Sequence, residues 1–369
     1  MSEYQYYEWQ TIDRPLTASE QREVNALSSH MDTVTSTQAL VTYSWGDFKH
    51  DPAQVLLKYF DAFLYDSNFG SRRLMFRLPK NLVDVEVIRA YCLEYWITLE
   101  EHGKYFVLEI SGNDEDGYEW VETEGTLGQL TSLREQVLQG DCRMLYLRWL
   151  KAMETDPDIA EDEPGPSIPA GLKELNAGLQ AFVEFFDINQ YLVAAAAASS
   201  KKAASMPETD FASAISKLTR SETDHYLHQI LSGEPGAVLM LKKRLMELSG
   251  KSVAPSSPAT LTIGKMIQQA EKIKEDALRK ARQDAERQRI QRLEKLAQQE
   301  EAAWTKVEEL LDQKRGTAYD EATRLLAELH ELAKLKKWEF KYQERFRAIC
   351  VKYGKSVALM RRFHHAGLL

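Results

Sequence analysis

The sequence of 369 residues has few cysteines and none in a paired arrangement. Cys92, Cys142 and Cys350 are far apart, and no two of them form a CxxC spacing. This argues against a thiolate zinc site and a disulfide framework, and it fits a reducing compartment. A P-loop, GxGxxG, GxSxG and the protein-kinase motifs are also missing, so the enzyme classes that depend on them have no support. We predict no cofactor.

Long apolar runs are missing too. The most hydrophobic helical stretch, AFVEFFDINQYLVAAAAASS, carries Glu184 and Asp187. It falls short of the roughly 20 uninterrupted apolar residues of a membrane span. The first 15 residues, MSEYQYYEWQTIDRP, lack the basic and apolar regions of a signal peptide. We therefore expect a cytoplasmic protein with no membrane contact.

Charge is plentiful but unevenly divided. The net charge is −9; residues 1–165 hold 30 acids and 14 bases, and residues 166–369 hold 26 acids and 33 bases. This asymmetry indicates two parts with different surfaces or partners, or two parts that attract each other. The length favours two or three domains, and a hydrophobic content of 44% is enough to bury a core.

Residues 1–153 alternate between strand and helix patterns. Thr17 with Glu20 forms a capping box, and Asp51 before Pro52 starts another helix. Strands are expected at 4–9, 39–45 and 72–79, helices at 51–65 and 81–95, and a hairpin joining 104–111 to 118–124. The predicted fold class is α+β: an N-terminal, mostly antiparallel sheet with helices on one face, followed by an all-α region with a long helix or coiled-coil arm.

Composition divides the chain further. Residues 154–169 combine prolines with acids, as linkers do, and strand patterns stop beyond them. The predicted segments are an acidic α+β domain at 1–153, a linker at 154–169, a helical domain at 170–250, a linker at 251–260, a long helix or coiled-coil arm at 261–315 and a basic C-terminal helical hairpin at 316–369.

The stretch RQDAERQRIQRLEKLAQQEEAAW, residues 282–304, favours helix yet has almost no apolar stripe. Its mixed charges suit a solvated helix held by ion pairs along one face. Two interpretations stay open: an arm that pairs with other helices at its ends, or a long helix folded partly against its own bundle. A sustained dimeric coiled coil is less favoured, because the central core positions are not apolar.

Three sequence clusters suggest chemistry but fit structural roles better. GNDEDGYEWVE fails as a calcium loop, since the first and twelfth positions would be Gly112 and Thr123. His225 and His228 lie one helical turn apart without a third metal ligand at a recognisable spacing. The third cluster lies at a strand-to-helix turn and could do acid–base work or cap the helix: Asp47, His50 and Asp51.

Arg72, Arg73 and Arg77 lie on and beside a strand in an otherwise acidic domain. They form a candidate site for docking an anion or a partner. The alternative is that they pair internally with the surplus carboxylates.

The C-terminal 36 residues carry a strong positive charge with four interleaved aromatic residues, Trp338, Phe340, Tyr342 and Tyr353. Such a surface favours nucleic acid, through phosphates and stacked bases, or an acidic protein. The same aromatic residues have the spacing of a small helical core. The candidate binding residues are Lys336, Lys337, Lys341, Arg345, Arg347, Lys352, Lys355, Arg361 and Arg362.

Segments of residues 166–369, outside the long helix, resemble uncharacterised bacterial helical proteins of the SWIM zinc-finger-associated group. The segments are GLQAFVEFFDINQYLVAAAAASS, SETDHYLHQILSGE, YDEATRLLAELHELA and KYGKSVALMRRFHHAGL. The CxC and CxH zinc-finger pattern is absent here, so the resemblance carries over no zinc or DNA role. It implies a helical scaffold that works beside other proteins.

Three functional hypotheses follow, in this order. The first is a non-enzymatic modular interaction or scaffold protein of a bacterial multi-protein system, with other proteins as partners. The second is a nucleic-acid-binding component, for example of a defence system, that uses the basic C-terminal helices. The third is an enzyme with an unrecognised site in the N-terminal domain.

Overall fold

A computed structural model describes residues 3–113, 123–156, 158–160, 162, 164–202, 211–232, 234, 236–249 and 262–369. The chain divides into two compact units, Met1–Lys274 and Glu275–Leu369. The division falls after Lys274, so the predicted linker at residues 154–169 lies within the first unit.

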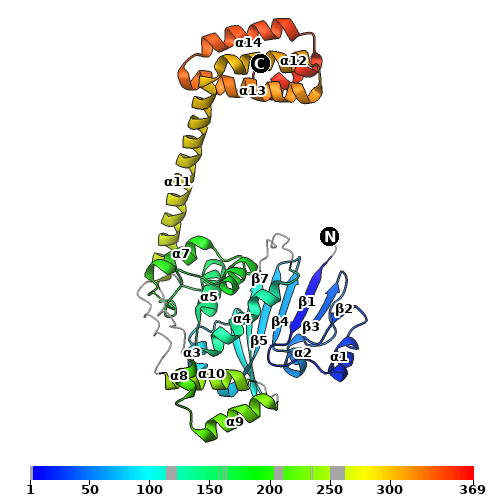
Figure 1. Cartoon of the computed structure of the whole chain (residues 1–369), viewed down its shortest axis with the longest axis vertical. Coiled ribbons are helices and arrows are strands. Elements are labelled where there is room, and N and C mark those ends of the chain that lie inside the picture. Colours follow the sequence, from blue (N-terminus) through cyan, green and yellow to red (C-terminus); the bar gives the residue numbers. More distant parts are fainter. Residues whose placement is uncertain are drawn as a thin grey trace. The chain divides into compact units, whose positions relative to one another are not determined.

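Seven strands form one antiparallel sheet among the described residues of the first unit (Figure 1). The strands are β1 (Gln5–Gln10), β2 (Met31–Val34), β3 (Gln38–Tyr43), β4 (Ala62–Ser67), β5 (Ser71–Pro79), β6 (Ile97–His102) and β7 (Tyr105–Asn113). Their order in the sheet is β2-β3-β1-β4-β5-β7-β6. The predicted α+β class, with a mostly antiparallel sheet and an all-α C-terminal region, is confirmed.

Helices cover both faces of this sheet. Successive residues of β1 divide between two hydrophobic cores, Tyr6 in one and Tyr7 in the other, as the two-residue repeat of a strand requires. On the Tyr6 side lie α4 (Thr126–Leu138) and α5 (Arg143–Thr155); on the Tyr7 side lie α1 (Ala18–Asn25) and α2 (Pro52–Tyr59). The sequence predicted helices on one face only. The second face is covered because Val24 and Leu56 give α1 and α2 apolar sides that must also be buried.

The expected helix at residues 51–65 ends at Tyr59, and its last part belongs to β4. β4 lies between β1 and β5, where both of its faces are buried. A strand buried on both sides is a continuous apolar run, which periodicity alone does not distinguish from a buried helix. This explains the misplaced boundary.

The region after β5 also differs from the prediction. The expected helix at 81–95 is reduced to a 3₁₀ turn, η1 (Lys80–Leu82), and one short helix, α3 (Val85–Arg89). β7 pairs with β6, across a turn containing Gly103. Of the expected partner strand at 118–124, and of the GNDEDGYEWVE turn, residues 114–122 lie outside the described residues.

The predicted linker packs onto the sheet unit. Trp96 Nε1 donates a hydrogen bond to Asp156 Oδ2 at 2.7 Å, and the Tyr91 hydroxyl donates to the Ser167 carbonyl at 2.8 Å. Gly165 lies against the ring of Trp149, where a Cβ atom would come within 2.5 Å of the ring. These contacts make the segment part of the first unit's interior packing.

Five helices follow the linker within the described part of residues 170–250. They are α6 (Ala177–Phe185), α7 (Gln190–Ser199), α8 (Phe211–Ile215), α9 (Arg220–Leu231) and α10 (Ala237–Leu248). Phe182 and Phe186 belong to the hydrophobic cluster that contains Leu74 and Phe76 of β5. The part of the predicted helical domain at 170–250 that α6 and α7 form therefore shares its core with the sheet. The predicted linker at 251–260 lies outside the described residues.

The long helix, α11 (Ile263–Gln298), belongs partly to each unit (Figure 1). Met266 and Ala270 join the first unit's core, and Leu293 joins a separate core in the second unit. Nearly all positions from 271 to 292 are exposed, and none is buried. Ion pairs three residues apart line this part, at Arg279–Asp276, Arg287–Asp284 and Arg289–Glu286. The solvated middle of the helix agrees with the sequence prediction.

The expected single helix at 261–315 is two helices, because α11 ends at Gln298 and α12 (Glu300–Asp312) follows. Gln299 between them is outside the helical conformation, at φ −122° and ψ 24°. The break lets Trp304, Val307 and Leu311 face a core built with α13 (Gly316–Lys336), α14 (Glu339–Tyr353) and α15 (Val357–His365). Apolar residues resume after the polar middle of α11, and they need these partners for burial.

Candidate functional site

The predicted basic surface lies on α13, α14 and α15, and four of its nine cations have acidic partners. The pairs are Lys341–Glu300 at 3.1 Å, Arg345–Glu301 at 2.6 Å, Lys352–Glu308 at 3.0 Å and Arg362–Asp320 at 2.6 Å. The first three join α14 to α12, with numbers that rise together, so these two helices run parallel. This side of α14 is therefore neutralised within the bundle.

The other five cations make no ion pair within the described ranges, and all five are exposed. They are Lys336, Lys337, Arg347, Lys355 and Arg361. Arg347 is on the solvent side of α14, together with Phe340 and Val351 at positions i, i+7 and i+11. The side chains of Phe340 and Val351 are 84% and 87% exposed. We call Phe340 and Val351, together with these five cations, the α14 surface.

The aromatic residues of the C-terminal segment divide between the buried core of the bundle and its exposed surface. Tyr342 and Phe346 are stacked at 5.7 Å between ring centroids, inside the bundle core. The Tyr342 hydroxyl donates to the Leu326 carbonyl at 3.1 Å, and burial raises the pKa of this hydroxyl. Tyr353 donates to Asp312 at 2.7 Å. Of the aromatic residues expected to stack on bases, Tyr342 is unavailable, whereas Trp338 and Phe340 are exposed.

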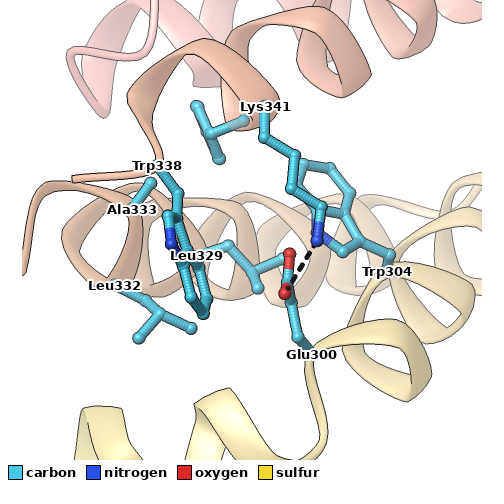
Figure 2. A pocket seen from close by; sticks show the side chains of 8 residues that line it. Glu300, Trp304, Leu329, Leu332, Ala333, Trp338 and Lys341 are labelled. Atoms are coloured by element: carbon cyan, nitrogen blue, oxygen red, sulfur yellow. Dashed lines mark hydrogen bonds and ion pairs between the residues drawn. The ribbon is translucent and has the colours of Figure 1, made fainter. Parts of the chain in front are cut away.

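A small cavity lies where α12, α13 and α14 meet. Figure 2 shows Trp304 and Trp338 on its two sides, with the Lys341–Glu300 ion pair between them. Its volume is about 10 Å³, the space of one water molecule, so it does not accommodate a substrate or cofactor. A second hollow runs along α11 beside Arg282 and Ile290, and it is lined by that single helix, with no opposing wall.

Arg72, Arg73 and Arg77 do not form a docking patch. Each pairs internally: Arg72 with Asp66 at 2.9 Å, Arg73 with Glu109 at 2.7 Å and Arg77 with Asp61 at 2.6 Å. Arg72 and Arg77 are also buried. The alternative of internal pairing is therefore the one that the structure supports. Alternation along β5 gives the physical reason, because it directs Arg72 to one sheet face and Arg73 and Arg77 to the other.

Arg77 belongs to a buried network that joins α4 to the sheet. Arg134 of α4 makes a bidentate contact with Asp13, with both nitrogen–oxygen distances at 2.9 Å. Asp61 Oδ2 accepts hydrogen bonds from the backbone amides of Ile12 at 2.6 Å and Asp13 at 2.9 Å. The four charged side chains, Asp13, Asp61, Arg77 and Arg134, are almost completely shielded from solvent. Their hydrogen bonds hold strands and helix together, and they leave no exposed group for a ligand.

Asp47, His50 and Asp51 do not converge on a site. Asp47 Oδ1 accepts a hydrogen bond from Gln5 Nε2 at 2.9 Å, and Asp51 Oδ1 accepts one from the Ala53 amide at 2.9 Å as the N-cap of α2. His50 is exposed and contacts the edge of the Phe48 ring. Two of the three side chains therefore serve the local turn and helix start.

The capping role of Asp51 predicts a stability effect. Asp51→Ala should lower the free energy of unfolding of the first unit by about 1 kcal/mol, because one amide of α2 loses its acceptor. His50→Ala serves as the matched control and should leave it unchanged. Urea denaturation followed by circular dichroism measures both. Equal losses for the two variants would contradict the capping role.

Comparisons of the chain with protein-family models, with curated proteins and with solved structures find no match. No group of three His, Cys, Asp or Glu side chains within the described ranges is arranged to hold a metal ion. Among the helices described, none combines the length and apolar character that a membrane crossing requires.

Proposed function

We propose that the protein is a non-enzymatic modular interaction protein, and that its second unit docks an acidic protein partner on the α14 surface. The observation that carries this proposal is that Phe340 and Val351 are exposed on the same side of α14 as Arg347, which makes no ion pair within the described residues. Exposed apolar side chains in a charged setting are typical of binding surfaces, and hot spots combine an aromatic anchor with arginine. Phe340 and Arg347 supply both.

A protein partner fits this surface better than a nucleic acid does. Glu301 and Glu308, on the neighbouring helix α12, neutralise Arg345 and Lys352 along one side of α14, which shortens the row of free cations that a phosphate backbone would follow. Tyr342, expected to stack on bases, is buried. An acidic segment with apolar side chains would satisfy Arg347 and cover Phe340 and Val351 together. Membership in a bacterial multi-protein system rests on the SWIM-associated resemblance and stays a prediction.

A capture experiment tests the proposed surface. Immobilised full-length protein should retain an acidic partner, which is identified, purified and titrated by calorimetry. The double variant Phe340→Ser, Arg347→Glu should weaken binding by about a hundredfold, the range of a lost hot spot. Arg282→Glu makes the same charge change on exposed α11 and should alter affinity by less than about threefold. Equal losses in both variants would mean that net charge, not the α14 surface, drives binding.

Nucleic acid is the second candidate, and the five cations that make no ion pair within the described ranges keep it open to test. We expect no binding of a fluorescein-labelled 20-nucleotide single strand at 50 mM salt. If binding occurs, Lys336→Ala and Lys337→Ala should each reduce the slope of log K against log salt concentration by about one, the value for one lost phosphate contact. Salt-dependent binding that loses slope in this way would replace the protein-docking proposal.

A further inference from the structure

Two exposed aromatic side chains lie on neighbouring turns at one end of the sheet. β3 ends at Tyr43 and β4 ends at Ser67, and both residues are paired with Gln5 at the start of β1. Trp45 and Phe69 each follow two residues later, and they are 73% and 49% exposed. Because adjacent strands are about 4.8 Å apart, the two turns begin about 10 Å from each other, on either side of β1.

Both turns contain a glycine and are held by hydrogen bonds to β1 and the residue before it. Gly46 and Gly70, directly after the aromatic residues, have φ of 79° and 91°, a conformation that favours glycine. Gln5 Nε2 donates to the Gly46 carbonyl at 3.1 Å. Asn68 and Tyr4 exchange two hydrogen bonds, at 2.8 and 3.1 Å. Aromatic side chains on such fixed turns lose little further freedom when they bind.

Gln5 links one turn to the buried side of the sheet. Its side-chain oxygen accepts hydrogen bonds from the hydroxyls of Tyr7 at 2.6 Å and Tyr65 at 3.1 Å, while its amide nitrogen donates to Gly46 and Asp47. The side chain of Gln5 is buried. Packing in the core therefore sets the position of the Trp45 turn.

Carboxylates border these turns. Asp47 lies two residues after Trp45, and Glu3 is exposed next to Tyr4. Burial raises the pKa of the Tyr4 hydroxyl, and three nearby carboxylates raise it further: Asp32, Asp66 and Glu124. Within the described residues, Glu3, Asp32, Asp47 and Glu124 form no ion pair with a cation. The surface around the two aromatic residues is thus rich in negative charge.

The cations at this end of the sheet neutralise few of these carboxylates. Arg72 and Arg73 are engaged with Asp66 and Glu109. Lys49 is exposed on the Trp45 turn. The first unit as a whole holds 40 acids and 26 bases. A ligand that fits must bring positive charge to the carboxylates and a flat or apolar group to the aromatic rings. Arginine and lysine side chains do both, since they stack on aromatic faces and pair with carboxylates.

We propose that this end of the sheet binds an arginine- or lysine-rich segment of a partner protein, with Trp45 and Phe69 as anchors. This surface lies in the first unit and differs from the α14 surface in both residues and charge. The protein then has two docking surfaces of opposite sign, one in each unit. The inference goes beyond the proposed function and stands or fails separately from it.

A fluorescein-labelled peptide of eight arginines spaced by serines is the probe, and the full-length protein is titrated into it at 150 mM salt to screen general attraction. Fluorescence anisotropy reports the affinity. Trp45→Ala should weaken binding by about tenfold and Phe69→Ala by about threefold, because each removes an aromatic contact to a cation. Trp45→Phe should recover part of the loss.

Tyr95→Asn is the matched control, because Tyr95 is 79% exposed in the same unit and has a φ of 67° that asparagine tolerates. It should change the affinity by less than about twofold. The double variant at Phe340 and Arg347 should also bind the arginine peptide normally, which separates this test from that of the α14 surface. Equal affinity of the wild type and Trp45→Ala, with unchanged circular dichroism, would overturn the proposal.

Discussion

Asp61→Asn is expected to lower the free energy of unfolding of the first unit by about 3–5 kcal/mol, the usual range for breaking a buried ion pair from one side. The asparagine has nearly the same shape, so the loss reflects charge. Arg77 would then lose the carboxylate with which it pairs, and Arg134 would keep only that of Asp13, in an interior that excludes water. Urea denaturation followed by tryptophan fluorescence measures the change.

Glu23→Gln is the matched control for Asp61→Asn. Glu23 forms an ion pair with Lys58 at 3.2 Å, and both side chains are exposed. Solvent screens such a pair, so no measurable change is expected. A small loss in Asp61→Asn, similar to that in Glu23→Gln, would show that the network contributes little to stability.

The contribution of Asp61 to the free energy of unfolding depends on pH and is lost in acid. Burial alone would raise the pKa of this carboxyl, but Arg134, Arg77 and two backbone amides together hold it below its ordinary value of 3.8. The unfolded chain therefore takes up the proton at a higher pH than the folded protein does. The contribution of Asp61 is complete above the unfolded pKa and is lost as the pH falls through the folded pKa. The difference between wild type and Asp61→Asn should accordingly narrow below about pH 4.

Phe182→Ala is expected to lower the free energy of unfolding of the first unit by about 3–5 kcal/mol, as truncation of a fully buried phenylalanine usually does. Phe182 has no exposed surface and lies 4.8 Å from Phe186 between ring centroids. α6, which carries it, packs on α4, and α4 packs on the sheet. The loss should therefore reach the sheet itself.

Hydrogen exchange distinguishes a shared core from a separate helical domain. Amides of β1 and β5 should exchange faster in Phe182→Ala, because one cooperative unit opens as a whole. Leu227→Ala, on the exposed side of α9, should leave them unchanged. If the sheet amides keep their wild-type protection in Phe182→Ala, residues 170–250 form the independent domain that the sequence predicted.

Local signals predicted local structure well. Thr17 and Glu20 form the expected capping box, and Asp51 with Pro52 starts α2. Each of these features depends on residues within four positions of one another, so the sequence states it directly. The polar middle of α11 was predicted on the same basis, because exposure of a helix follows from the absence of an apolar stripe.

The candidate sites were predicted less well. Nothing near Lys341 in the sequence indicates that Glu300 neutralises it, since the two are 41 residues apart. The exposure of Trp45 and Phe69 was missed for the same reason. An aromatic residue followed by glycine between two strands is a turn signal, but burial depends on what packs over the turn.

By itself, the sequence determined the α+β class, the helix starts, the uneven charge and the solvated middle of the long helix, because neighbouring residues encode all of these. Only the tertiary structure decided that residues 164–199 share the sheet's core and which cations stay unpaired. Burial and ion pairing join side chains that are distant in the chain, and their partners are fixed only when the helices and strands pack together.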